Sequence, residues 1–166
     1  FFILRGRLSV LALLGVALLA PAHAFGFKNS TERLKATKVC PRCDLSKADL
    51  KKADLRNADL RHTVLLHADL KDANLKEANL SGTILFAADL SGADLSGAKL
   101  YGSYLSEANL SGANLRGAIL WGTVLFKANL TGVDMTGAVM KETNLDGAIL
   151  CRTKMPSGRE DNSGCK

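Results

Sequence analysis

The feature that most constrains this chain is an apolar residue at every fifth position. From Leu45 to Met155, each fifth residue is Leu or Met without exception over 23 units. The residue two places earlier is always small or β-branched, and the residue between them is Asp or Asn in fourteen units. The unit therefore has the pattern A(D/N)LxG, as in residues 93–97.

A period of five fits neither an α-helix nor a flat strand. On a helix, successive leucines would be rotated by about 140° and would scatter around the axis. On a strand, the odd spacing would send them to alternate faces. The chain must therefore turn once per unit. Glycine supplies that turn, because all ten glycines between Gly82 and Gly147 lie two residues after the central Leu or Met, where a positive φ is expected.

A second period of twenty residues is superimposed on the first. In every fourth unit the alanine is replaced, and in four successive units of this series the Asp or Asn column is apolar or aromatic. The next outward position is apolar in three of those four units. The small column becomes Cys43, Thr63, Thr83, Ser103, Thr123 and Thr143. On this side, the position before the central residue is Val64, Ile84, Tyr104 and Val124. The position after it is Leu66, Phe86, Ser106 and Phe126. One side of a four-sided coil therefore differs from the other three.

These units resemble the pentapeptide-repeat family, over about 116 of the 166 residues. The resemblance implies an all-β fold, a right-handed quadrilateral parallel β-helix in which four units form one coil and about six coils stack into a solenoid. It also implies that the central residue and the small residue point inward and the other three point outward. Phe, which is common at the central position in the family, never occurs there in this chain.

The segments around the repeats complete the predicted organisation. Residues 1–24 combine two arginines, an apolar run of about thirteen residues and the sequence AHA before a cleavage point, which predicts an export signal peptide. That run is too short for a bilayer of about 30 Å, so no stable membrane span is expected after cleavage. Residues 25–40 are predicted to be an N-terminal cap with a short helix over 29–36. Residues 41–156 form the repeats, and 157–166 a polar C-terminal tail expected to be loop.

The formal net charge of +6 does not indicate a nucleic-acid partner once it is divided by region. Residues 41–80 contain eight basic and seven acidic residues, and residues 81–150 contain four and six. The repeats are therefore near neutral, and the basic excess lies towards the two ends of the chain. Nucleic-acid binding needs positive charge clustered on one face, so no nucleic-acid partner is expected.

Four cysteines lie near the two ends of the repeats: Cys40, Cys43, Cys151 and Cys165. The first pair, in a Cys-Pro-Arg-Cys sequence, resembles the active site of thiol–disulfide oxidoreductases, although the βαβ context of those enzymes is absent. A metal site would need two further convergent ligands. In the β-helix that the resemblance implies, Cys151 lies about 25 Å from the first pair, beyond disulfide reach. We therefore expect the disulfides Cys40–Cys43 and Cys151–Cys165, one at each end.

Little else in the sequence suggests catalysis. After residue 24 the only histidines are His62 and His67, both at outward corner positions, and a solid prism has no cleft that would hold a catalytic base. The carboxylates of the Asp column lie on different faces, where they are expected to serve solubility and turn hydrogen bonds. The sequence therefore predicts no catalytic residue, no cofactor and no metal site.

The irregular side predicts an interaction surface, which we call the apolar stripe. It consists of Val64, Leu66, Ile84, Phe86, Tyr104, Val124 and Phe126, with Trp121 on the adjoining side. β-Propensity would act on all four sides, yet the other three sides taken together keep Asp or Asn at most positions of the same column. An exposed apolar patch larger than roughly 300 Å² usually marks a contact surface. The stripe is therefore expected to dock a protein partner or a second copy of the chain.

Together these observations favour an exported, non-catalytic scaffold or protein-interaction module in a periplasm or a thylakoid lumen, or one that is secreted. One alternative, raised by the family resemblance, is a DNA-mimicking inhibitor of DNA gyrase, a topoisomerase. Such members carry strong negative charge and dimerise through a C-terminal segment, whereas these repeats are near neutral. The second alternative is a thiol–disulfide oxidoreductase that acts through Cys40 and Cys43.

Overall fold

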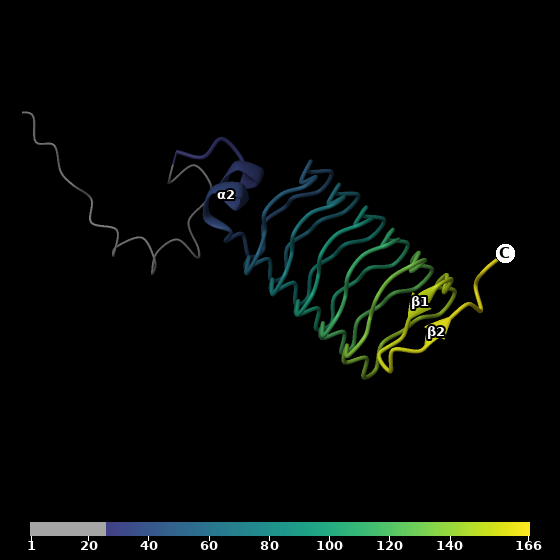
Figure 1. The fold of residues 1–166 in the computed structure, drawn as a ribbon. Coiled ribbons are helices and arrows are strands. Elements are labelled where there is room, and N and C mark those ends of the chain that lie inside the picture. The colour runs from purple at the N-terminus through teal and green to yellow at the C-terminus, as the bar shows by residue number, and fades with distance from the viewer. Residues whose placement is uncertain (1–25) are drawn as a thin grey trace, which may run out of the picture.

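A computed structural model describes residues 26–166, which form a solenoid of stacked coils (Figure 1). The predicted signal peptide, residues 1–24, lies outside the described residues. Parallel β-bridges join residues twenty positions apart, from Val39↔Asp59 at one end to Asp134↔Lys154 at the other. Four five-residue units therefore make one coil, as the twenty-residue period predicts.

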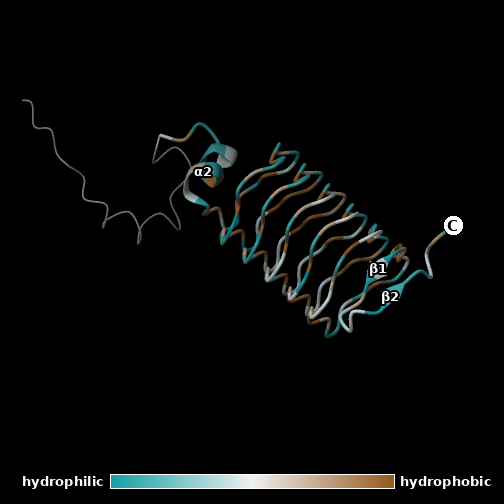
Figure 2. Ribbon diagram, viewed as in Figure 1, coloured by the Kyte–Doolittle hydropathy of each residue, from teal (hydrophilic) through white to brown (hydrophobic). Residues whose placement is uncertain are grey.

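The four sides of the coil are numbered here by their central residues. Face 1 contains Leu65, face 2 Leu70, face 3 Leu75 and face 4 Leu80, and each series recurs every twenty residues. The chain passes through faces 1, 2, 3 and 4 in that order before it returns to face 1 one coil further on. Figure 2 shows hydrophobic and hydrophilic residues alternating along the coils, because inward and outward positions alternate within each unit.

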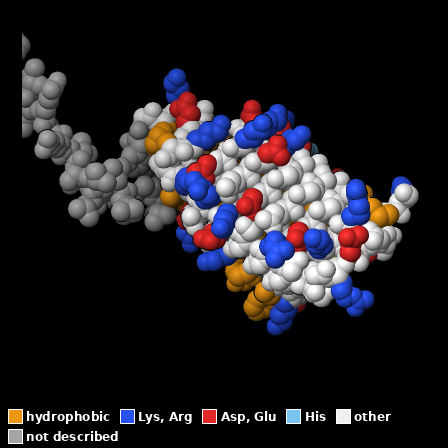
Figure 3. All heavy atoms as spheres, in the orientation of Figure 1, with side chains coloured by type: hydrophobic (Ala, Val, Ile, Leu, Met, Phe, Trp, Pro, Cys, Tyr) orange, Lys and Arg blue, Asp and Glu red, His pale blue; other side chains and the backbone are white. Residues whose placement is uncertain are grey.

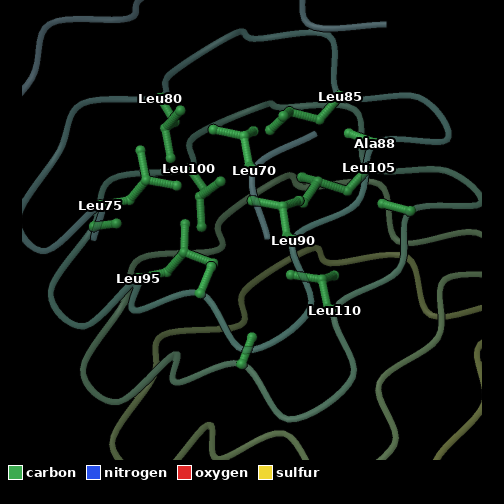
Figure 4. Close-up of a cluster of buried hydrophobic side chains, with 14 of the residues drawn as sticks. Leu70, Leu75, Leu80, Leu85, Ala88, Leu90, Leu95, Leu100, Leu105 and Leu110 are labelled. Carbon is green, nitrogen blue, oxygen red and sulfur yellow. The ribbon is translucent and has the colours of Figure 1, made fainter. Parts of the chain in front are cut away.

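The core is a column of leucines with small residues between them (Figure 4). The central leucines from Leu45 to Leu130 are at most 2% exposed, and the alanines from Ala58 to Ala128 at most 1%. Each buried leucine contributes about 1.5–3 kcal/mol to stability. Since four leucines and four small residues fill every coil, the column packs without any aromatic side chain.

On face 1, hydroxyl residues replace most of the buried alanines, and some of these hydroxyls link neighbouring coils. Thr63 and Thr123 donate their hydroxyls to carbonyls 23 residues earlier, those of Cys40 and Leu100, at 2.7 Å. Among residues 26–166, no buried side-chain nitrogen or oxygen lacks a hydrogen-bond partner. Thr83 and Ser103 instead donate to the carbonyls of Leu80 and Leu100, three residues earlier in the same coil. Each hydroxyl is therefore paired, and only some of the substitutions add a hydrogen bond between coils.

Every unit turns its corner through one residue with positive φ. From Gly82 onward glycine holds most of these positions, as at Gly112 with φ 67°. In the first coils other residue types hold it, including Lys47, Asn57, His62 and Glu77 with φ of 56–58°. This left-handed region is unfavourable for residues that carry a Cβ. The stacking of neighbouring coils must therefore offset a conformational cost at these corners.

The side chains of the Asp/Asn column form hydrogen bonds to the backbone at the outside of the corners. A side-chain oxygen accepts the backbone N–H two residues further on, as between Asp94 and Ser96 at 2.9 Å, an Asx turn that fixes the chain direction. Asp44 accepts both the hydroxyl of Ser46 at 2.6 Å and its N–H at 2.9 Å. These bonds stabilise the carboxylate and hold the pKa of Asp44 below its ordinary value of 3.8.

The N-terminal end of the solenoid is covered by a short helix, α2 (Ser30–Thr37). Asn29 caps this helix by accepting the N–H of Glu32 at 2.9 Å, and Lys38 ends it in the left-handed conformation with φ 58°. Leu34 on α2 is fully buried and belongs to the hydrophobic core. The helix thus supplies the apolar cover that the first coil lacks on its outer side.

The C-terminal tail differs from the expected loop. Two residues of the tail form β2 (Glu160–Asp161), which pairs antiparallel with β1 (Thr153–Lys154) in the last coil. The disulfide Cys151–Cys165, with a Cα–Cα distance of 4.7 Å, ties the tail to the same coil. The physical reason is that the edge of the last coil has unpaired backbone groups, and the tail satisfies part of them.

The conformational cost of the corners can be measured with two reciprocal substitutions. Ala87 has φ 51°, and nothing lies within 4 Å of a Cβ built onto Gly112. Ala87→Gly should raise the free energy of unfolding and Gly112→Ala should lower it, each by about 1 kcal/mol, because backbone preference is the main change. Urea unfolding of both variants measures the two signs. A change in the same direction for both would contradict the explanation.

The hydroxyl of Ser46 provides a test of the Asx turns. Ser46→Ala should raise the pKa of Asp44 towards 3.8, whereas Ser46→Thr, which keeps the hydroxyl, should leave it low; an NMR titration of the carboxyl measures both. Because the folded pKa lies below the unfolded value, this stabilisation is complete above about pH 4 and is lost as the pH falls through the folded pKa. The alanine variant should therefore lose less stability on acidification than the threonine variant.

Candidate functional site

The apolar stripe occupies face 1, where its first row forms one continuous ladder. β-Bridges join Val64 to Ile84, Ile84 to Tyr104, and Tyr104 to Val124, so these residues lie on successive coils. Tyr104 is 53% exposed and Ile84 37%, while Val64 and Val124 are half-buried. Coils are spaced by about 4.8 Å, so the row is a ridge of apolar side chains that runs along the solenoid axis.

The second row of the stripe lies on the other side of the central leucines of face 1. Phe86 and Phe126 are 37% and 39% exposed, and Leu66 is half-buried. The ring of His67 meets Phe86 edge-on at 5.9 Å between centroids. The Nζ atom of Lys127 lies 5.1 Å from the ring centre of Phe126. Each of these two exposed rings therefore has a polar side chain against it.

Trp121 and Tyr101 extend the surface onto the adjoining face 4. Their ring centroids are 6.5 Å apart, and Trp121 is 43% exposed. The Nζ atom of Lys141 lies 4.7 Å from the ring centre of Trp121, close enough for a cation–π interaction. Faces 4 and 1 share a corner, so these rings lie beside the first row of the stripe.

Two apolar residues of this extension, Ile119 and Val139, were not predicted from the sequence. Bridges join Lys99 to Ile119 and Ile119 to Val139, which places both apolar residues in one row of face 4. Val139 is 49% exposed. Their signal is visible in the sequence, because the column that begins with Asp59 and Asn79 turns apolar at the same twenty-residue spacing.

The distribution of aromatic residues sets faces 1 and 4 apart from the rest of the molecule. The five aromatic residues of positions 41–156 all point outward from these two adjacent faces: Phe86, Tyr101, Tyr104, Trp121 and Phe126. None contributes to the core, where a chain of this size would normally place them. Their exposure is therefore a property of the surface and is not required by packing.

The other outward positions are mostly polar or carry paired charges. Arg56 forms a two-bonded ion pair with Asp54, and Arg61 with Asp59, at 2.7–2.8 Å. These guanidinium groups hold the pKa of both carboxyls below its ordinary value. On the side drawn in Figure 3, positive and negative side chains are interspersed and separated by a broad uncharged band. This side of the molecule therefore shows no patch of a single sign of charge.

The geometry of the first cysteine pair does not suit thiol chemistry. The structure joins Cys40 to Cys43 with a Cα–Cα distance of 5.4 Å, and Cys40 is fully buried. The pair follows the C-terminal end of α2, since Lys38 is the C-cap of that helix. A helix C-terminus disfavours a thiolate, whereas the reactive cysteine of an oxidoreductase needs an exposed position near a helix N-terminus.

Within residues 26–166 there is no group of three or more His, Cys, Asp or Glu side chains that could hold a metal ion. The described part does have a shallow hollow at the C-terminal end, between Met155 and the tail residues Ser157 to Asn162. It contains no histidine or free cysteine. His62 and His67 both lie at exposed corners.

None of the helices among residues 26–166 is long and apolar enough to cross a membrane. The only described helix is α2, with eight residues.

Comparisons with known proteins identify the family to which the repeats are similar. A family model described as pentapeptide repeats matches residues 43–82, 83–122 and 122–155. These matches span the described coils almost from end to end. No curated protein matches the chain.

Three of the solved structures with similar repeats come from cyanobacteria and a plant. A pentapeptide repeat protein of Cyanothece 51142 is 29% identical, with 72% of this chain and 91% of that chain covered and a TM-score of 0.36. HetL of Nostoc, involved in heterocyst differentiation regulation, is 32% identical over 74% and 72%, with a TM-score of 0.34. A thylakoid-lumen protein of Arabidopsis thaliana is 30% identical over 68% of each chain, with a TM-score of 0.37.

Proposed function

The chain belongs to the pentapeptide-repeat family, and from that premise we propose that it is a non-catalytic, exported scaffold that docks a protein partner through the apolar stripe. The solenoid that presents the stripe is proposed to be right-handed and to contain about six coils, as the family resemblance implies. The observation that carries the proposal is the placement of all five repeat aromatics outward on faces 1 and 4.

The stripe has the composition of a protein contact surface. Trp and Tyr are enriched where proteins meet, because a large apolar ring is combined with a polar group that needs no burial. Here the exposed rings of Tyr104, Trp121 and Phe126 lie on a rigid, hydrogen-bonded backbone. A rigid surface loses little conformational entropy on binding, which favours docking of a partner without rearrangement of the coils.

Export is supported by two independent features. Residues 1–24 have the composition of a signal peptide, and all four cysteines of the chain are paired in disulfides. Disulfides persist in oxidising compartments and are rare in the cytosol. A periplasm, a thylakoid lumen or the exterior of the cell satisfies both features.

The two alternative functions have less support. Inhibition of DNA gyrase by mimicry requires a dense negative surface that matches one charge per about 1.7 Å of duplex. The repeats instead pair their carboxylates with Arg56, Arg61 and Arg116. An oxidoreductase role requires an accessible cysteine, and Cys40 is fully buried. Strong inhibition of gyrase supercoiling by the purified protein would reverse this preference.

The docking role of the stripe can be tested with charge placed at its centre. Phe86→Asp combined with Phe126→Asp should abolish crosslinking of the native partner, because two buried carboxylates would lose hydration at the contact. The matched control is Ser91→Asp combined with Thr131→Asp, at the same unit position on face 2 of the same coils. Both variants should keep the far-UV circular dichroism spectrum and unfold within about 0.5 kcal/mol of the wild type.

The measurement is whether the native partner is crosslinked to each variant in the native compartment and recovered with it. Loss of the same partner from both variants, or its retention by both, would contradict a specific role for the stripe.

The exported location makes a separate prediction about the cysteines. Protein recovered from its own compartment should contain Cys40–Cys43 and Cys151–Cys165 as disulfides, because an oxidising environment preserves them. In the chain-entropy model, closing the loop between Cys151 and Cys165 stabilises the fold by about 3 kcal/mol. Mass spectrometry of non-reduced peptides identifies the pairs. Free thiols in that sample would count against export to an oxidising compartment.

A further inference from the structure

Positive charge is concentrated at the end of the solenoid that α2 covers. Residues 26–57, which comprise the cap and the first coil, contain nine basic and four acidic residues. The other coils, residues 58–156, contain nine and ten, and the tail, residues 157–166, contains two of each. Since α2 and the tail lie at opposite ends (Figure 1), the molecule has one basic end, formed by residues 26–57, and one end that is near neutral.

The four carboxylates of the basic end already have partners within it. They belong to Glu32, Asp44, Asp49 and Asp54. The first three accept backbone N–H groups of their own helix end or corner at 2.9–3.2 Å. Asp54 forms ion pairs with Lys38 at 3.1 Å and with Arg56 at 2.8 Å. The acidic groups are therefore held close to the backbone or to neighbouring cations.

Three cations of the first coil differ from these pairs. Arg42, Lys47 and Lys52 are exposed, and none of them forms an ion pair with any residue of the described part of the chain. Each holds a corner position with φ of 53–58°, a conformation that is unfavourable for a residue with a Cβ. Glycine holds the equivalent corners in later coils, as at Gly82 and Gly92. Backbone stability therefore does not explain lysine and arginine here.

The three cations surround the solenoid axis. Arg42 lies at the corner between faces 4 and 1, Lys47 at the corner between faces 1 and 2, and Lys52 at the corner between faces 2 and 3. A ligand on one lateral face could contact two corners at most. Only a surface that crosses the axis at the end of the solenoid can approach all three, and long flexible side chains can bend towards such a surface.

From this arrangement we propose that the basic end binds the surface of a membrane rich in anionic lipid, so that the solenoid stands upright on the bilayer. A flat anionic surface meets the three corners and the exposed Lys35 of α2 together. The predicted export signal ends at residue 24 and α2 begins at Ser30. The basic end is therefore the part of the fold nearest to the segment that directs the chain to a membrane.

The attraction has the strength and range that such binding needs. Each Lys or Arg near an anionic surface raises membrane partitioning about fivefold, and the effect fades within a Debye length of about 8 Å. Cations at the other end of the solenoid are too distant to contribute. Lys127, for example, lies four coils from Lys47 in the same column, which corresponds to about 19 Å.

An upright solenoid keeps the apolar stripe accessible. The first row of the stripe follows the solenoid axis from coil to coil, so it would run away from the bilayer. Both the stripe and its extension on face 4 would then remain open to a partner in the compartment. Membrane binding by the basic end thus goes beyond the docking role of the stripe and does not depend on it.

Co-sedimentation with lipid vesicles tests the proposal. Oxidised protein recovered from its own compartment should bind vesicles of phosphatidylglycerol and phosphatidylcholine in equal parts, and added salt should weaken this binding. It should not bind vesicles of phosphatidylcholine alone. The combined variant Arg42→Gln, Lys47→Gln and Lys52→Gln should lower the partition coefficient roughly a hundredfold, about fivefold for each cation.

The matched control removes the same charge from the opposite end. It combines Lys127→Gln, Lys141→Gln and Arg152→Gln, three exposed cations of the last two coils. Its partition coefficient should stay within about twofold of the wild type, because these cations lie beyond the screening distance. Both variants should keep the far-UV circular dichroism spectrum. An equal loss of binding in both would show an effect of net charge alone and would overturn the proposal.

The single tryptophan reports the orientation. Trp121 lies four coils from Pro41 in the same column, about 19 Å along the axis. Its emission maximum and its quenching by acrylamide should not change when the protein binds vesicles. A blue shift with loss of quenching would show that the solenoid lies on its side, against the proposal. Phe86→Asp with Phe126→Asp should bind vesicles as the wild type does, so failure of this proposal is distinguishable from failure of the docking role.

Two further results would also overturn the proposal. Equal binding to both kinds of vesicle would indicate insertion of an apolar segment rather than attraction to anionic headgroups. Displacement from the vesicles by poly-L-glutamate at a lower concentration of charge than the lipid supplies would show that the basic end prefers an acidic polypeptide. Retention on the vesicles in the presence of the polymer is the expected result.

Discussion

The backbone hydrogen bond between residues of neighbouring coils is the interaction on which the rest of this structure depends. It forms only if the chain returns to the same place every twenty residues, and this in turn requires a corner in every unit. At most corners that bend uses a residue with positive φ, the carbonyl of the central leucine and the Asx bond from the Asp/Asn column. Each coil is therefore held by contacts to its two neighbours, and stability accumulates along one dimension.

This construction explains the unusual composition. Leucine, methionine and small residues fill the interior on every side, so the core of residues 41–156 contains no Phe, Tyr or Trp. Aromatic residues are then free to serve the surface. Their restriction to faces 1 and 4 therefore carries more information about function here than it would in a protein whose core also uses them.

A solenoid must also end, and this chain ends differently on its two sides. Leu34 of α2 closes the core at the N-terminal end, where the strand edge is charged. At the C-terminal end a disulfide-bonded tail covers two faces and leaves two open. Val139, which extends the apolar surface on face 4, lies in the last coil. Beside it, among residues 138–147, the backbone N–H groups of Met140 and Leu145 donate to no acceptor within the described residues.

Much of this could be predicted from the sequence, because the repeat is strict. The period of five fixed the inward Leu and Ala columns and the corners, and the period of twenty fixed the four-sided coil and the position of Val64, Ile84 and Tyr104 on one face. The tertiary structure decided what periodicity does not encode. Tail residues Glu160 and Asp161 have no repeat to define their register, and they pair with β1 because only the folded last coil offers them an edge. The extension through Ile119 and Val139, and the open amides of residues 138–147, likewise depend on which groups remain without a neighbour once the coils are stacked.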